Sequence, residues 1–162
     1  MKCWGGKRPA GITVLEALLA TVVLAAAAAT VIMPFAAGAR CTAEDARLTV
    51  AVDLAEALME EILSKPFSDP NGSEAGETGR SNWDDMDDYN GYSEGQGQIS
   101  SFDGVAVDDS ATVNLTRQAT VQGVYVAGQD TGEDPTFLRI TVEVKYRGET
   151  VVELSRLAYA NE

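Results

Sequence analysis

Two short stretches of the sequence contain residues whose types and spacing could do chemistry. In the first, a single carboxylate, Glu16, stands at the start of a long apolar run, just after Gly11 and Ile12. An ionised side chain in hydrocarbon costs from about 2.5 kcal/mol upward, so this acid needs a partner or a function. The second stretch is a cluster of four aspartates: Asp84, Asp85, Asp87 and Asp88. Such a cluster suggests calcium, which prefers several oxygen ligands.

The remaining residues argue against catalysis. The chain contains no histidine, which excludes Ser/His/Asp and Cys/His arrangements and histidine-based zinc sites. No G-x-S-x-G motif and no glycine-rich phosphate loop occurs in the sequence. The aspartates lie in a hydrophilic segment that gives no sign of the apolar pocket an acid catalyst requires. We therefore expect no enzymatic activity.

The calcium hypothesis has a simpler alternative. Counted from Asp85, the fifth position of an EF-hand would be Tyr89 and the sixth would be Asn90 instead of glycine, so that template fails. Trp83, Tyr89 and Tyr92 are expected to anchor the segment. A solvated acidic loop with local Asx turns is therefore the preferred interpretation, no cofactor is expected, and calcium remains the alternative.

Charge is distributed unevenly along the chain. Lys2, Lys7 and Arg8 precede the apolar run without an acid among them, whereas the part after residue 40 holds all but one of the 25 acidic residues. An acidic body repels phosphate backbones, so we expect no nucleic-acid partner. If the leader with Cys3 is removed, Cys41 has no partner within the chain, and no disulfide framework is expected.

The apolar run predicts a membrane span. Residues 17–39 are without charge, and as a helix they would extend about 34 Å, enough to cross a bilayer. The basic leader and acidic body predict a leader in the cytoplasm and a body outside. A secretory signal peptide or a plain anchor is the alternative, but the run is longer than a signal core and has an acid at its front edge.

The order of residues around Gly11 resembles the class III signal of type IV prepilins and type II secretion pseudopilins, in which a glycine and a hydrophobic residue precede T-L-x-E. The resemblance implies that a prepilin peptidase cuts between Gly11 and Ile12 and methylates Ile12. Glu16 then becomes the fifth residue, about one helical turn from the new amine and on the same face. The family implies that this carboxylate meets the N-terminal amine of a neighbouring subunit and sets the register of assembly, a known use of buried charge pairs.

Helical periodicity continues beyond the membrane span. The apolar residues Leu48, Val52, Ala55, Met59 and Ile62 recur on one side, with Leu58 and Leu63 flanking them and Asp45, Asp53, Glu56 and Glu60 opposite. We expect one helix over residues 12–64, kinked or weakened at Pro34 and ended by Pro66.

Two strings resemble one pilin family more closely. The sequences MEEILSKPFSDP at 59–70 and DDMDDYNG at 84–91 are similar to those of the minor pilin D family of mannose-sensitive haemagglutinin pili. This resemblance covers about the first 70 residues well and the acidic segment moderately.

Alternating patterns predict strands in the last third of the chain. Residues 111–128, 136–148 and 149–160 are rich in Val, Thr, Leu and Tyr with period two, and a weaker strand is expected over 99–107. Gly148 and Glu149 fit a two-residue hairpin turn. The predicted fold is α+β and pilin-like: a long N-terminal helix packed on a mainly antiparallel sheet.

The expected organisation follows from these elements. It comprises a cytoplasmic leader (1–11), a transmembrane or fibre-core helix (12–39), an amphipathic helix (40–65), an acidic surface loop (66–98) and a sheet domain (99–162). We expect a minor pilin-like subunit, anchored in the inner membrane by a single pass and then assembled into a fibre. Its expected partners are the prepilin peptidase, other pilin or pseudopilin subunits and an inner-membrane assembly platform. The alternatives are a type II secretion pseudopilin and an anchored, cation-binding surface module that never assembles.

Overall fold

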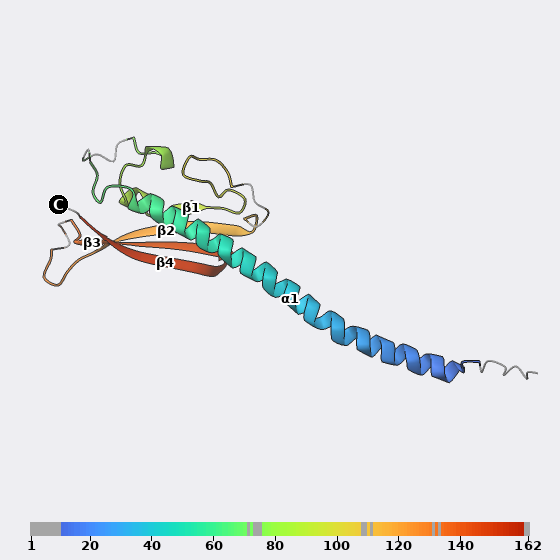
Figure 1. Cartoon of the computed structure of the whole chain (residues 1–162). Helices are drawn as coiled ribbons and strands as arrows, with labels where there is room; N and C mark the ends of the chain where they lie inside the picture. Colours follow the sequence, from blue (N-terminus) through green and yellow to red (C-terminus); the bar gives the residue numbers. More distant parts are fainter. Residues whose placement is uncertain are drawn as a thin grey trace, which may run out of the picture. The chain divides into compact units, whose positions relative to one another are not determined.

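The computed structural model describes residues 11–70, 72, 76–107, 110, 112–130, 132 and 134–160. The leader expected over 1–11 therefore lies outside the described residues, except for Gly11. The predicted α+β fold is confirmed: one long helix, α1 (Val14–Leu63), packs on a four-stranded antiparallel sheet (Figure 1). The chain forms two units, divided between Glu44 and Asp45.

The first half of α1 is long and apolar enough to cross a membrane. An 18-residue stretch of this helix has a mean hydropathy of 2.3, and none of that stretch is buried. The hydroxyls of Thr21 and Thr30 donate to the carbonyls of Leu18 and Ala27, at 2.8 and 2.7 Å, so both satisfy themselves within the helix. The helix continues through Pro34, and the kink or local weakening expected at this residue stays a prediction.

The second half of α1 buries a narrow apolar face. Its buried residues are Ala51, Leu54, Ala55, Leu58, Met59, Glu61 and Ile62. The predicted stripe is correct in direction but wrong in two places: Leu58, expected at its flank, is fully buried, and Leu48 is 49% exposed. The guanidinium of Arg47 stacks on Tyr146, the last residue of β3. Leu48 therefore lies near the end of the sheet, where little surface is available to cover it.

The sheet is a meander of four strands in the order β1 (Ser93–Glu94), β2 (Leu115–Val124), β3 (Phe137–Tyr146) and β4 (Glu149–Tyr159). Each neighbouring pair is antiparallel. Burial alternates along β3, where Leu138, Ile140, Val142 and Val144 face the core. This period of two is the pattern of a sheet with one buried and one solvated face.

Two local predictions were wrong. The β3–β4 turn is Arg147–Gly148, with φ of 52° and 90°, and not Gly148–Glu149. Two central residues with positive φ are typical of a type I′ turn, whose twist matches that of the strands. The expected strand over 99–107 is reduced to one isolated bridge between Ser100 and Ala106.

The segment expected as a loop over 66–98 contains more structure than the sequence indicated. It holds two short 3₁₀ helices, Arg80–Asn82 and Asp87–Tyr89, and contributes β1 to the sheet. The ring centroids of Trp83 lie 4.7 Å from Tyr89 and 5.1 Å from Tyr92, both edge to face. The prediction that these three aromatic residues anchor the segment is confirmed.

Candidate functional site

The start of α1 brings together the residues of the predicted processing motif. The backbone N–H of Glu16 donates to the hydroxyl of Thr13 at 3.3 Å, and that of Ala17 donates to the Thr13 carbonyl at 3.1 Å. Thr13 therefore caps the helix, and Glu16 is the third helical residue after it, as in a capping box. An acid in the first turn also suits the positive end of the helix dipole.

In the described part of the chain, no packing contact explains why residues 11 and 12 are Gly11 and Ile12. A Cβ atom added at Gly11 would meet nothing within 4 Å, so no described neighbour requires glycine there. The side chain of Ile12 is exposed. The identity of these residues is therefore free to serve something other than folding.

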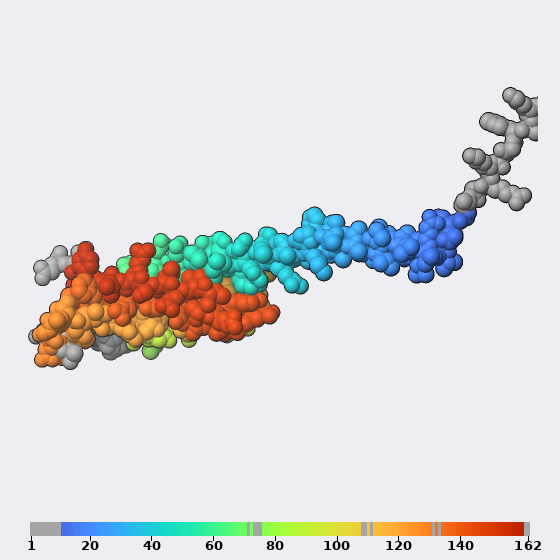
Figure 2. Space-filling model, turned by 90° about the horizontal axis from the view of Figure 1, so that it is seen from below, coloured from blue at the N-terminus to red at the C-terminus, as the bar shows by residue number. Residues whose placement is uncertain are grey.

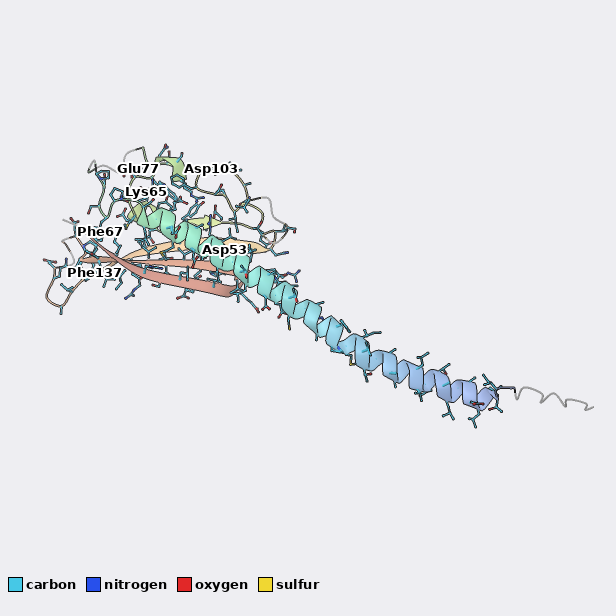
Figure 3. All side chains as sticks on the ribbon, viewed as in Figure 1. Asp53, Lys65, Phe67, Glu77, Asp103 and Phe137 are labelled. Carbon is cyan, nitrogen blue, oxygen red and sulfur yellow. The ribbon has the colours of Figure 1, made fainter. Side chains whose placement is uncertain are left out.

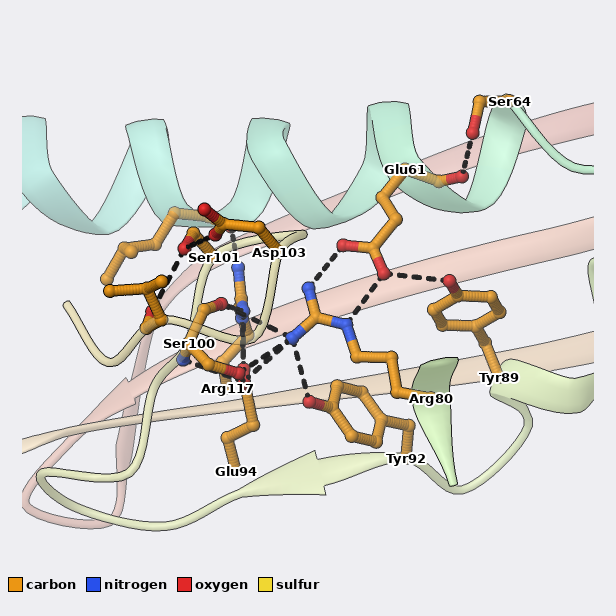
Figure 4. A network of polar contacts seen from close by, with 12 residues as sticks. Glu61, Ser64, Arg80, Tyr89, Tyr92, Glu94, Ser100, Ser101, Asp103 and Arg117 are labelled. Atoms are coloured by element: carbon orange, nitrogen blue, oxygen red, sulfur yellow. Dashed lines mark hydrogen bonds and ion pairs between the residues drawn. The ribbon is translucent and has the colours of Figure 1, made fainter. Parts of the chain in front are cut away.

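A buried charge network links the end of α1 to the sheet (Figure 4). The Arg80 guanidinium donates to both carboxylate oxygens of Glu61 and reaches Glu94 at 3.2 Å. Arg117 pairs with the other Glu94 oxygen at 2.5 Å and donates to the carbonyl of Leu54 at 2.9 Å. Two acids and two guanidiniums thus alternate, which leaves the cluster electrically balanced.

Further hydrogen bonds complete the network. The Tyr89 hydroxyl donates to Glu61 at 2.7 Å, and the backbone N–H of Ser100 donates to Glu94 at 2.9 Å. Burial alone would raise the pKa of Glu61, but the bonds from Arg80 and Tyr89 lower that pKa below its usual value. Burial likewise opposes ionisation of Glu94, while Ser100 and Arg117 lower its pKa. The cluster can hold the acidic segment against the helix. Each carboxylate in it is paired with a guanidinium.

Sequence reasoning missed this network, although one signal was available. Glu61 lies three residues after Leu58 and one before Ile62, on the apolar side of the helix. An acid at such a position must be paired, because a lone buried charge is too costly. The partners Arg80 and Arg117 come from distant segments, so their identity could not be read from spacing.

Two of the four aspartates of the acidic segment, Asp85 and Asp88, bind the backbone of their own cluster. One oxygen of Asp85 accepts from the N–H groups of Asp87 and Asp88 at 3.0 and 3.2 Å. One oxygen of Asp88 accepts from the N–H groups of Asp84 and Asp85 at 2.9 and 3.4 Å. These are the Asx-type turns expected of a structured loop.

Asp85 departs from the expectation of a purely solvated acid. It is almost completely buried, and burial together with its hydrogen bond to the Asp87 carboxylate raises the pKa of Asp85 to about 6. An acid whose pKa is raised on folding binds more protons in the folded state between its two pKa values. It therefore lowers stability as pH rises from about 4 to about 6.

Two groups of carboxylates are close enough to share a cation. Asp85, Asp87 and Asp88 form one group and Asp69, Glu77 and Asp84 the other, with oxygens within 4.8 Å of one another in each. A cavity of about 290 Å³ is lined by acids from three segments: Asp69, Asp85, Asp87 and Asp134. Asp69, Glu77 and Asp134 were not among the sequence candidates, since only the fold brings them to the cluster.

The chain was compared with protein-family models, with curated proteins and with solved structures, and none of the three comparisons gave a match.

Proposed function

We propose that the chain is a non-catalytic, minor pilin-like subunit of a type IV pilus. In this proposal a prepilin peptidase removes the leader after Gly11, and the segment 12–39 holds the subunit in the inner membrane until it enters a fibre. The observation that carries the proposal is Glu16, an ionisable residue in the first turn of a 50-residue helix whose first half is apolar. A plain membrane anchor has no need of a charge at the start of its apolar run.

The surroundings of Glu16 support this proposal. Its capping contact with Thr13 is made by the backbone N–H, so the cap does not depend on the carboxylate. The carboxylate is thus available for a cation, and after cleavage the new amine of Ile12 lies about one turn away along the chain. In a fibre the nearest such amine outside the same chain belongs to a neighbouring subunit, and pairing with it sets the register.

Two other functions share parts of this evidence. A type II secretion pseudopilin has the same N-terminal requirements, so the assembly machinery on which the chain depends decides between the two. An anchored module that binds cations and never assembles draws on the acidic cavity around Asp85. That module predicts neither leader removal after Gly11 nor a role for Glu16.

The test is made on the full chain, expressed in cells that contain a type IV pilus machinery. Leader removal is followed by mass, and incorporation by the amount of the subunit in sheared fibres. Glu16→Gln removes the charge and keeps the side-chain shape, while the matched control Thr13→Ala removes the helix cap and keeps the charge. We expect Glu16→Gln to be processed but at least tenfold depleted from fibres, and Thr13→Ala to be incorporated.

The outcomes separate the three functions. Normal incorporation of Glu16→Gln would refute the registration role. Equal depletion of both variants would reduce Glu16 to a helix-capping residue. A wild-type chain that is absent from sheared fibres in the presence of the machinery would favour the anchored module where the leader is retained, and the pseudopilin where the leader is removed after Gly11.

A further inference from the structure

Two arginines share one tyrosine ring in the unit formed by residues 45–162, which we call the body. The guanidinium carbon of Arg47, on α1, lies 3.9 Å from the ring centre of Tyr146, the last residue of β3. The guanidinium carbon of Arg147, in the β3–β4 turn, lies 5.2 Å from the same ring centre. Figure 1 and Figure 2 both show this turn beside the cyan part of α1. The ring therefore holds two positive charges near each other.

Neither guanidinium has a second partner among the residues that the structure describes. Arg47 and Arg147 form no ion pair, and their side chains donate no hydrogen bond to a described group. Stacking uses the flat face of a guanidinium and leaves the N–H groups at its edge. These edges are the donors that bind phosphate oxygens two at a time. The two arginines are thus held in place with their phosphate-binding edges unused by the described part of the chain.

Carboxylates lie close to the same arginines. Glu44 and Asp45 precede Arg47 in the sequence, and all three of these positions lie on α1. Glu149 is the cross-strand neighbour of Tyr146. None of these three acids forms an ion pair with a described residue. This surface therefore carries both signs of charge side by side, and the ligand that matches it carries an anionic and a cationic group together.

The apolar run of the chain ends close to this surface. Arg47 comes eight residues after Ala39, the last residue of the uncharged run 17–39, which is about 12 Å along a helix. The headgroup layer of a bilayer extends about 5–8 Å beyond the hydrocarbon. Side chains of an α-helix tilt toward its N-terminus, so the Arg47 side chain tilts toward the run and can span the remaining distance. In an inserted chain, lipid headgroups are therefore within reach of this surface.

The residue types around the ring also suit a membrane surface. Tyr146 is half-buried, whereas Leu48 is 49% exposed and Val113 is 55% exposed. Val113 precedes Asn114, whose carbonyl accepts from the backbone N–H of Arg147 at 3.1 Å. Tyrosine is enriched at membrane interfaces, where its ring lies in apolar surroundings and its hydroxyl in water. Exposed apolar side chains next to the arginines can contact the upper part of the lipid chains.

We propose that Arg47 and Arg147 bind the phosphate of a zwitterionic phospholipid headgroup, such as that of phosphatidylethanolamine, while the subunit is in the membrane. The edges of the two guanidiniums donate to the phosphate oxygens. The headgroup ammonium meets the carboxylates of Asp45 and Glu149. The proposal rests on the membrane segment of the proposed function, and it requires neither leader removal nor a fibre.

The test measures lipid retention by native mass spectrometry. The full chain is released from maltoside micelles that contain equal amounts of phosphatidylethanolamine and phosphatidylglycerol, and the wild type should retain phosphatidylethanolamine preferentially. The double variant Arg47→Gln with Arg147→Asn removes both guanidiniums, and asparagine tolerates the positive φ of residue 147. This variant should retain phosphatidylethanolamine at least about fivefold less than the wild type, because both phosphate-binding side chains are lost.

The matched control is Arg139→Gln with Arg156→Gln. It removes the same charge from two exposed arginines that also form no ion pair with a described residue. Figure 3 labels Phe137, the first residue of β3, near this end of the sheet, whereas Tyr146 ends the same strand. The control should change retention less than about twofold. Excess inorganic phosphate, added to the wild type, should leave the retained lipid in place.

Three results would overturn the proposal. These are equal retention by the wild type and the Arg47→Gln, Arg147→Asn variant, a preference for phosphatidylglycerol, and displacement of the lipid by inorganic phosphate, which would assign the arginines to free phosphate. A circular dichroism melt of each variant shows whether a lost lipid comes from a lost fold. Flotation with vesicles separates this proposal from the proposed function. A wild type that does not float contradicts the membrane segment itself, whereas one that floats but fails in lipid retention refutes only this inference.

Discussion

Replacing Arg80 by methionine should destabilise the body by about 3–5 kcal/mol at pH 7, which is the usual cost of leaving a buried charge uncompensated. Arg80 is the ion-pair partner of Glu61, whose side chain is 3% exposed, and one of two partners of Glu94, which is 5% exposed. Without Arg80, the Glu61 carboxylate keeps only the hydrogen bond from the Tyr89 hydroxyl among the described residues, whereas Glu94 keeps Arg117 and Ser100. Glu61 should therefore account for most of the loss.

The pH dependence identifies the mechanism. In the wild type the pKa of Glu61 is lowered on folding, so this residue contributes stability above its unfolded pKa and loses it as pH falls. In Arg80→Met the burial of Glu61 has no guanidinium to offset it, and the pKa should be raised instead. The loss of stability caused by Arg80→Met should then shrink between pH 7 and pH 5, and adding Glu61→Gln should recover part of it at pH 7.

The assay is urea unfolding of the processed chain in detergent, followed by the fluorescence of Trp83, which contacts Tyr89 and Tyr92. Lys145→Met is the matched control, because it breaks a partly exposed pair with Glu143 at 3.0 Å and should cost less than about 1 kcal/mol. A loss of stability in Arg80→Met as small as that of the control, or one independent of pH, would refute the assigned role of the network.

Three further predictions concern the packing, the turn and the acidic segment. In the same urea assay, Leu58→Ala should lower the free energy of unfolding by about 2–5 kcal/mol and Leu48→Ala by less than about 1 kcal/mol. The reason is that the Leu58 side chain is fully buried, whereas that of Leu48 is half-exposed. Equal losses would contradict the packing. Gly148→Ala should cost about 1–2 kcal/mol, measured by thermal melting, and Arg147→Asn should be neutral or stabilising, because both positions have positive φ. Asp85→Asn should raise the free energy of unfolding by about 1–3 kcal/mol at pH 7 and by little at pH 4, because the pKa of Asp85 is raised to about 6. An equal effect at both pH values would contradict the raised pKa.

The sequence predicted the fold class because its strongest patterns are local. The apolar run, the helical spacing through Ile62 and the alternation along β3 each act within one element. From these periods we predicted a long helix packed on an antiparallel sheet, and the structure has this fold. The motif around Gly11 and Glu16 was identified by its resemblance to the class III signal, and its role in assembly stays a prediction.

The features that sequence reasoning missed depend on contacts between distant segments. Glu61, Arg80 and Arg117 meet only because the loop after α1 folds back over the helix and the sheet. Asp134 joins the acidic cavity in the same way, from the loop between β2 and β3. The turn at Arg147 was misplaced by one residue, because a glycine can occupy either central position of a two-residue hairpin loop.

The most direct test of the central claim is mass spectrometry of the N-terminal peptide of the protein isolated from membranes. The proposal predicts a peptide that begins at Ile12, with or without one added methyl group, and no such peptide from a Gly11→Ala variant. A peptide that still begins at Met1, or one that begins near residue 40, would contradict it and would leave the carboxylate of Glu16 without the proposed partner.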